Sequence, residues 1–381
     1  MKIGSVQLSS PFVVSPMAGM TDTAFRRLVK RQGGCGLVVS EMVSSEGLVR
    51  GIDRTLEYAE YTEEERPVSI QIFGGEPAKM AEAARVVEAM GANIVDVNMG
   101  CPVPKIARHN AGCSLMREPR HAAEIIAAMT RAVKIPVTVK MRKGWDDGEV
   151  NAPELAKRVA AAGAAAIAVH GRTAKQSYSG CADWDVVAGI ARSVSIPVFG
   201  SGDCIEPEDI VARMQSGVSG VFVGRGVLRN PWILAQAQDL MAGRPARQIT
   251  DQERGQFLLD YMGMLLADEK GEQDGFRHLV AQSTPRRPEA SKERWVINKL
   301  RALCTWYTKG FEGGSHFRIG INSAKSVSEV EDLIANFFLP GSGVRDPGSV
   351  HQELFSTGPR TPDPGSRTPG PGSRIPDPGS R

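Results

Sequence analysis

The chain has 381 residues, of which 41% are hydrophobic and 23% charged, so it can bury a large core. Its formal net charge of +3 is too small to indicate a partner, so any nucleic-acid surface would need locally concentrated charge. Six widely spaced cysteines without a CxxC pair argue against a zinc site and suit free thiols in a reducing cytosol. We see neither a secretion signal nor an uncharged apolar run of about 20 residues, and therefore expect a cytoplasmic protein that does not enter the membrane.

The first 240 residues alternate short β-branched runs with Ala-rich amphipathic stretches. Eight runs resemble strands, at 12–15, 36–40, 67–72, 93–97, 136–140, 166–169, 196–199 and 220–223. Helical patterns lie between them, including 77–90, 120–133, 152–162, 183–193 and 206–216. This alternation predicts parallel strands with helical crossovers, and eight such units favour a closed TIM-type (β/α)₈ barrel over an open doubly wound sheet.

Each predicted strand is followed by a residue suited to ligand contact. These residues are Met17, Glu41, Gln71, Asn98, Lys140, His170, Ser201 and Gly224. In a barrel, the carboxyl ends of the strands meet at one mouth, where active sites are built. The alternative, that these residues cap the following helices, would suit one or two of them.

The remaining segments differ in character from the barrel. Residues 2–9 resemble a hairpin that closes the barrel floor. Nearer the C-terminus the sequence shows helical patterns at 252–268, 291–309 and 326–338, and we expect a polar loop at 270–290. After residue 340 a seven-residue Pro/Gly/Ser/Arg repeat has almost no apolar side chains, which predicts disorder. Its arginines could meet nucleic acid, but a dispensable extension is favoured. We therefore expect a barrel over 1–244, a helical domain over 245–340 and a disordered tail over 341–381.

Cys101 lies at a sharp turn in the sequence Asp-Val-Asn-Met-Gly-Cys-Pro after the fourth predicted strand. As a nucleophile, its thiol would need a base or a helix N-terminus to lower its pKa. As a general acid it would need to stay protonated, which a thiol with a pKa of about 8.5 does at neutral pH. Because the motif offers no histidine partner, the acid role is favoured. The other five cysteines are interpreted as structural.

Several further motifs indicate a phosphorylated ring ligand at the mouth. Lys140 would suit an anion or an electron-rich ring edge, and His170 and Arg172 follow the next strand. Glycine-rich segments at 200–203 and 224–226 follow the last two strands, where backbone N–H groups commonly bind phosphate in barrels. FMN fits this outline, whereas a phosphosugar or pyridoxal phosphate fits the phosphate half.

Taken together, these motifs resemble the tRNA-dihydrouridine synthases, most closely their bacterial B-type branch. The resemblance rests on PMAGMTD, SEM, SIQIFG, DVNMGCP, AGCSLM, VKMRKGW, HGRTAKQSYSGCADW, GSGD and GVFVGRGVLRNPW, and spans about residues 2–335. It implies an FMN-binding barrel with a C-terminal helical domain, NADPH or NADH as the reductant, and reduction of the uridine C5=C6 bond in tRNA. We also expect a monomer, and the cysteine spacing leads us to expect no metal.

The resemblance assigns roles to individual residues. It places Pro16, Met17 and Ala18 against the flavin, Gln71 at the ring edge, Lys140 and His170 near the ring and ribityl chain, and Ser201, Gly202, Asp203, Gly224 and Arg225 at the phosphate. It makes Cys101 the proton donor and Asn98 a uracil contact, and Arg172 is expected to contact the substrate. Ser201 stands where the family usually has Asn, so we expect phosphate binding there to use backbone N–H groups.

The helical region carries a local positive charge. Residues 286–325 contain nine Lys/Arg against three Glu, with five aromatic residues interleaved. This composition is typical of RNA binding, and Lys299 and Arg301 are the expected tRNA contacts. The aromatic residues are better interpreted as core.

Three other functions remain open at this stage. A flavoenzyme acting on free pyrimidines would share the barrel and flavin but have no use for a basic helical domain. A non-catalytic RNA-binding protein would not need Cys101, Lys140 and the phosphate loops. A flavin-free aldolase or synthase would be colourless.

Overall fold

The computed structural model describes residues 1–107, 110–267 and 289–339, without the side chains of residues 53, 54, 289 and 290. Residues Met1–Pro340 form one compact unit, so the division expected at 244/245 stays a prediction. The tail expected at 341–381 and nearly all of the loop expected at 270–290 lie outside the described residues.

Eight parallel strands close into a barrel, as the sequence predicts. They are β3 (Phe12–Val14), β4 (Leu37–Val39), β6 (Val68–Phe73), β7 (Ile94–Met99), β8 (Val137–Gly144), β9 (Ala166–Thr173), β10 (Val198–Ser201) and β11 (Gly220–Val223). The ring closes where β11 pairs with β3, with Phe222 opposite Val13. The strands are apolar along most of their length because the interior of the barrel and the surrounding helices cover both faces.

The floor of the barrel is sealed by an N-terminal hairpin, which confirms the prediction for residues 2–9. Its antiparallel strands are β1 (Lys2–Ile3) and β2 (Val6–Gln7). Ile3 and the following Leu8 are buried in an interior cluster with Phe199 and Phe222, whose rings meet edge to face at 5.4 Å. Side chains therefore fill most of the interior at this end, and active sites of such barrels lie at the opposite end, where the strands have their carboxyl ends.

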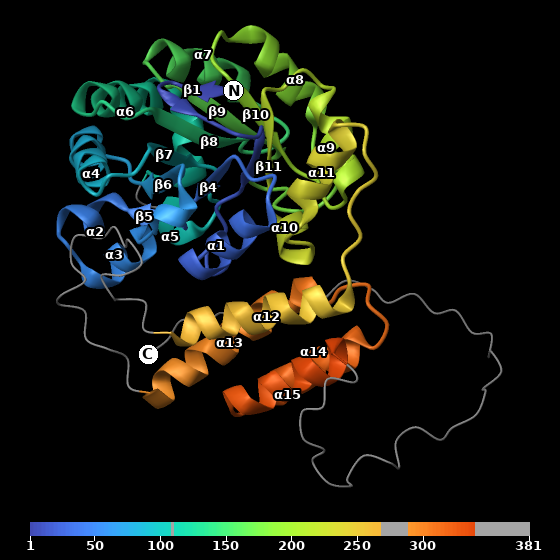
Figure 1. Ribbon diagram of the computed structural model, residues 1–381. Coiled ribbons are helices and arrows are strands. Elements are labelled where there is room, and N and C mark those ends of the chain that lie inside the picture. Colours follow the sequence, from blue (N-terminus) through green and yellow to red (C-terminus); the bar gives the residue numbers. More distant parts are fainter. Residues whose placement is uncertain (108–109, 268–288, 340–381) are drawn as a thin grey trace, which may run out of the picture. The chain divides into compact units, whose positions relative to one another are not determined.

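Helices surround the strands (Figure 1). The longer ones are α1 (Thr23–Gln32), α4 (Pro77–Ala89), α6 (Pro119–Ala132), α7 (Ala152–Ala161), α8 (Trp184–Ser193), α9 (Pro207–Met214) and α11 (Ile233–Met241). Shorter elements are β5 (Val43–Ser44), α2 (Ser45–Val49), α3 (Asp53–Ala59), η1 (Glu63–Glu65), α5 (Pro104–Ala107), η2 (Gly112–Arg117) and α10 (Arg225–Arg229). Four of the helices have proline in their first turn, where a missing N–H costs nothing. The five helices expected between strands are confirmed.

The C-terminal part is helical, as expected. It contains α12 (Asp251–Leu266), α13 (Glu289–Tyr307), α14 (Gly314–Ser323) and α15 (Val327–Phe338) (Figure 1). Phe257 of α12 stacks on Tyr307 of α13 at 5.8 Å, and Phe338 of α15 meets Tyr307 edge to face. Phe25 of α1 contacts Phe257 and Tyr261 edge to face, so aromatic packing joins these helices to the barrel.

Candidate active site

Polar side chains gather at the carboxyl ends of adjacent barrel strands. Asn98 of β7 is opposite Lys140 of β8, and His170 of β9 is opposite Ser201 of β10. Gln71 occupies the same end of β6. The expected convergence of strand-end residues is therefore present in the fold.

A chain of hydrogen bonds runs from the barrel interior to Cys101. Thr138 Oγ1 donates to Asp96 Oδ1 (2.6 Å), and Gln71 Nε2 donates to Asp96 Oδ2 (2.7 Å). Asn98 Nδ2 in turn donates to Gln71 Oε1 (2.8 Å), and Asn98 Oδ1 accepts from the Cys101 N–H (2.9 Å). The Cys101 backbone is thus held by Asn98, which is itself oriented by side chains of three neighbouring strands, β6, β7 and β8.

The charge of Asp96 determines which groups donate and which accept in this series of hydrogen bonds. Burial raises the pKa of Asp96 to about 6, against hydrogen bonds from Thr138 and Gln71 that lower it. Above that pH the carboxylate can only accept, so the NH₂ group of Gln71 must face it. The Gln71 oxygen then faces Asn98, which leaves the Asn98 oxygen for Cys101. One Gln71 N–H remains available to a ligand.

The Cys101 thiol is half-buried and protonated at neutral pH. Removal from water raises its pKa above the ordinary value, although the Val103 backbone and the Arg142 charge act in the opposite direction. Arg142 donates to the Gly100 carbonyl (2.9 Å), which steadies the turn. A thiol that keeps its proton at neutral pH is suited to general acid catalysis.

Lys140 and His170 supply a cationic and a neutral group to the same mouth. Burial, assisted by the Arg142 charge, lowers the pKa of Lys140 to about 8, against the attraction of Asp96. Burial and surrounding cations, first among them Lys140, lower the pKa of His170 to about 2, so its imidazole is neutral. His170 Nε2 is buried and has no hydrogen-bond partner among the described residues. Because such an atom is costly to leave unpaired, it marks a place where a polar ligand atom fits.

The loops after β10 and β11, where phosphate binding is predicted, each contain a glycine at a structurally defined position. Gly202 has φ +124°, and a Cβ there would lie 2.5 Å from the Ala182 side chain, so the position requires glycine. Gly224 caps α10, whose first residue is Arg225. The Asp203 side chain accepts from Arg172 and from the Ala182 N–H, and it lies 3.6 Å from the Arg225 guanidinium. Although burial raises the pKa of Asp203, these hydrogen bonds outweigh it and lower the value.

Residues 15–22 join β3 to α1 and are called the flavin-side loop because the predicted flavin contacts Pro16, Met17 and Ala18 lie in it. Its turn is closed by a hydrogen bond from the Met17 N–H to Thr21 Oγ1 (3.0 Å). Pro16 and Met17 are partly buried, and Ala18 is exposed. A Cβ on Gly224 would lie 3.5 Å from the Met17 sulfur, which places Met17 beside the loop after β11. Ser15 Oγ, like His170 Nε2, is a buried polar atom without a hydrogen-bond partner among the described residues.

Comparison with known proteins decides the family. A sequence model described as dihydrouridine synthase matches residues 13–338. A probable tRNA-dihydrouridine synthase of Rickettsia prowazekii is 38% identical over 349 residues, covering 89% of this chain and 97% of the relative. The chain belongs to the dihydrouridine synthase family. A probable tRNA-dihydrouridine synthase of Rhodobacter capsulatus is 46% identical over 245 residues, covering 64% of this chain and 75% of the relative. Another from Synechocystis is 36% identical and covers 88% of each chain.

A solved structure supports the fold of this dihydrouridine synthase family member. A complex of 2-naphthoyl-CoA reductase has a TM-score of 0.51 and 14% identity, covering 64% of this chain and 52% of that one. At this identity the likeness concerns the fold alone. Within the described residues, no group of three or more acidic, His or Cys side chains is placed to hold a metal. None of the helices in the described ranges combines the length and apolarity of a membrane crossing.

Three residues that support the site have no role in the sequence-based prediction. Asp96 lies two residues before Asn98, and Arg142 two residues after Lys140, so each shares a strand face with a predicted residue. That spacing could have identified both. Tyr178 exposes 57% of its surface and lies under the Arg225 guanidinium at 4.6 Å. Its place at the mouth comes from a loop fold that the sequence pattern does not specify.

Some predicted contact residues have intramolecular partners. Arg172 is 2% exposed and donates to Asp203 and to the carbonyls of Ser179 and Gly180. Arg301 donates to the carbonyls of Ile321 and Ala324 at the end of α14. Their substrate roles stay predictions.

Lys299 also has partners within the chain, because it bonds to the flavin-side loop at Asp22 and Gly19. Its role as a tRNA contact likewise stays a prediction.

Two of the five aromatic residues of 286–325, Tyr307 and Phe317, are buried in the main core, as expected for the group. The other three, Trp295, Trp306 and Phe311, are partly buried and pack against it.

Proposed function

We propose that this protein reduces the C5=C6 bond of specific uridines in tRNA, using FMN as cofactor and NADPH or NADH as reductant. The observation that carries the proposal is the protonated thiol of Cys101, whose backbone N–H is held by the Asn98 side chain, beside a mouth that contains Lys140 and the unpartnered His170 Nε2. The curated relatives named probable tRNA-dihydrouridine synthase support the same substrate. A protein acting on cytoplasmic tRNA is expected in the cytoplasm, as a monomer.

The residues at the mouth fit FMN. The loops containing Ser201, Gly202, Asp203, Gly224 and Arg225 would hold the phosphate, and Pro16, Met17 and Ala18 would pack against the ring. The free Gln71 N–H would bind the ring edge, and His170 Nε2 would gain a polar partner. When bound, reduced FMN supplies the hydride that uracil C6 receives, and NADPH or NADH restores it.

The protein's own contribution is position, charge and a proton. Cys101 donates its thiol proton to C5, so that C5 and C6 each gain one hydrogen and the double bond is lost. The Lys140 ammonium stabilises negative charge near the reacting ring. Asn98 and Arg172 are proposed substrate contacts. A stacked base exposes neither ring face, so the target uridine must leave its stack, at a cost of a few kcal/mol.

The tRNA would meet the basic helical part of the chain. Lys309 and Lys325 are exposed there, whereas Lys299 and Arg301 hold other parts of the chain. Lys309 and Lys325 are therefore better placed to meet phosphates, in addition to the predicted pair. Such a surface favours tRNA over a free pyrimidine as substrate.

Replacing Cys101 by Ala tests the mechanism. We expect the variant to keep bound flavin and NADPH oxidation but to lose dihydrouridine formation in tRNA, because the proton donor is gone. Cys181→Ala, which removes an exposed thiol, is the control and should keep full activity. Full activity in Cys101→Ala would remove this thiol from the mechanism.

The substrate is tested by nucleoside analysis of tRNA from a deletion strain, with and without the gene restored. Loss and recovery of dihydrouridine at defined positions is expected. Unchanged tRNA, together with reduction of free uracil or orotate by the purified protein, would favour a free-pyrimidine flavoenzyme.

A further inference from the structure

The side chain of Lys299 crosses from the helical part of the chain to the barrel. From α13, its ammonium lies 2.9 Å from Asp22 Oδ2 and 3.8 Å from Glu41 Oε1, and it donates to the Gly19 carbonyl at 2.9 Å. Only 14% of the side chain is exposed. Asp22 and Gly19 belong to the flavin-side loop, and Glu41 follows the adjacent strand β4.

Two further contacts make this a network. Glu41 Oε2 accepts from the Gly19 N–H at 2.5 Å, so Gly19 is held through both its N–H and its carbonyl. Tyr261 of α12 donates its hydroxyl to Asp22 Oδ2 at 2.8 Å. The helical part therefore contacts the flavin-side loop through two side chains from two helices.

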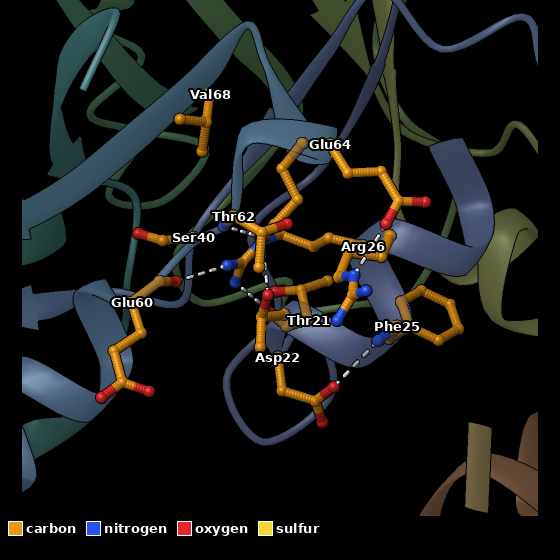
Figure 2. Close-up of polar contacts among 12 residues, drawn as sticks. Thr21, Asp22, Phe25, Arg26, Ser40, Glu60, Thr62, Glu64 and Val68 are labelled. Carbon is orange, nitrogen blue, oxygen red and sulfur yellow. Dashed lines mark hydrogen bonds and ion pairs between the residues drawn. The ribbon is translucent and has the colours of Figure 1, made fainter. Parts of the chain in front are cut away.

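The far end of the loop is held independently, within the barrel. Arg26 donates to the carbonyls of Thr21 (2.6 Å) and Glu60 (2.7 Å) and pairs with Glu65 (2.6 Å), and both charged side chains are fully buried. Figure 2 shows the guanidinium of Arg26 directed at the chain near Thr21, while Asp22 reaches back to the Phe25 N–H that it caps. Thr21 is fixed in this way, and the Met17 N–H bonds to its side chain, so outside support matters most for residues 18–20.

The two carboxylates around the Lys299 ammonium explain why a cation is needed at this position. Burial raises the pKa of Glu41, and Lys299 is the strongest influence against that rise. In turn, Asp22 and Glu41 outweigh desolvation and raise the pKa of Lys299. Without Lys299, two carboxylates would share one largely buried space, and the Gly19 carbonyl would lose its donor.

We propose that Lys299 is a positioning residue for the flavin-side loop, so that the helical part of the chain completes the cofactor site as well as meeting RNA. The inference rests on the proposed function only where flavin is concerned. Lys299 itself contacts the loop, and its effect on any bound ring passes through residues 18–20.

The first test measures the loop without any ligand. In Lys299→Met, which keeps the apolar stem and removes the charge, amide hydrogen exchange over residues 17–21 should accelerate by about tenfold or more. Arg294→Met removes an exposed charge from the same helix and should leave this exchange unchanged. Glu41→Gln should give the same acceleration, and combining it with Lys299→Met should add little, because both act on Gly19. Unchanged exchange in Lys299→Met would overturn the proposal.

The second test measures FMN affinity by fluorescence quenching. Lys299→Met should bind FMN about tenfold more weakly than the wild type and Arg294→Met, with the melting temperature as a check on folding. If Lys299→Met shows normal loop exchange and normal FMN affinity but binds tRNA more weakly, Lys299 is an RNA contact only. That result would overturn the proposal. If the wild type binds no FMN, the proposed function fails, while the exchange result still decides whether Lys299 holds the loop.

Discussion

At the scale of single residues, Asp96 sets the order of the groups above it. As a buried acceptor it orients Gln71, which orients Asn98, which holds the Cys101 backbone. The sequence predicted Gln71, Asn98 and Cys101 because each lies at a strand end. It could not show that they form one chain, because partners on neighbouring strands depend on register.

The raised pKa of Asp96 makes stability depend on pH. Between pH 3.8 and about 6 the native carboxyl keeps a proton that the unfolded chain has lost, so the free energy of unfolding falls as pH rises through this window. The shift corresponds to about 3 kcal/mol. Asp96→Asn has no carboxyl group at this position and lacks the dependence. Its free energy of unfolding minus that of the wild type, measured by urea titration, should therefore rise by about 3 kcal/mol from pH 4 to pH 7. The exposed control Asp332→Asn should not change in this way, and parallel curves for Asp96→Asn and the wild type would contradict the assignment.

At the scale of elements, the turn after β10 depends on Gly202. In Gly202→Ala the new methyl would meet the Ala182 side chain in a backbone conformation that L-residues avoid. We expect FMN affinity to fall by about tenfold or more, measured by fluorescence titration. Gly217→Ala is the matched control: its φ is +85°, but nothing lies within 4 Å of the added methyl. Equal losses in both variants would mean that general backbone strain, and not the local structure of the turn after β10, determines the result.

Element prediction succeeded where periodicity was strong. The eight strands and five crossover helices followed from β-branched runs and amphipathic spacing. The pattern did not reveal α14, because Gly-Ser-His-Phe-Arg-Ile-Gly-Ile-Asn-Ser contains two glycines and few strong helix formers. Burial of Phe317 and Ile321 against neighbouring helices stabilises it instead. The bridge made by Lys299 was also beyond prediction, because it joins residues far apart in sequence.

At the scale of the whole molecule, the first compact unit ends at Pro340, and the match to the dihydrouridine synthase sequence model ends at residue 338. A chain that stops after Pro340 should therefore keep its melting temperature, FMN affinity and dihydrouridine formation. Thermal melting and nucleoside analysis of the truncated protein check this. Weaker tRNA binding with unchanged melting would instead give the arginines of the repeat a part in RNA recognition.

Because the barrel closes by pairing its last strand, β11, with its first, β3, the ring cannot form until nearly all of it has been synthesised. About 200 residues separate these strands, so a ribosome working at about 5–20 residues per second needs roughly 10 to 40 s to supply the missing partner. During that interval one edge of β3 presents unpaired backbone groups between apolar side chains, a surface prone to joining other nascent chains. We therefore expect the growing chain to need protection of this edge until residue 223 leaves the exit tunnel.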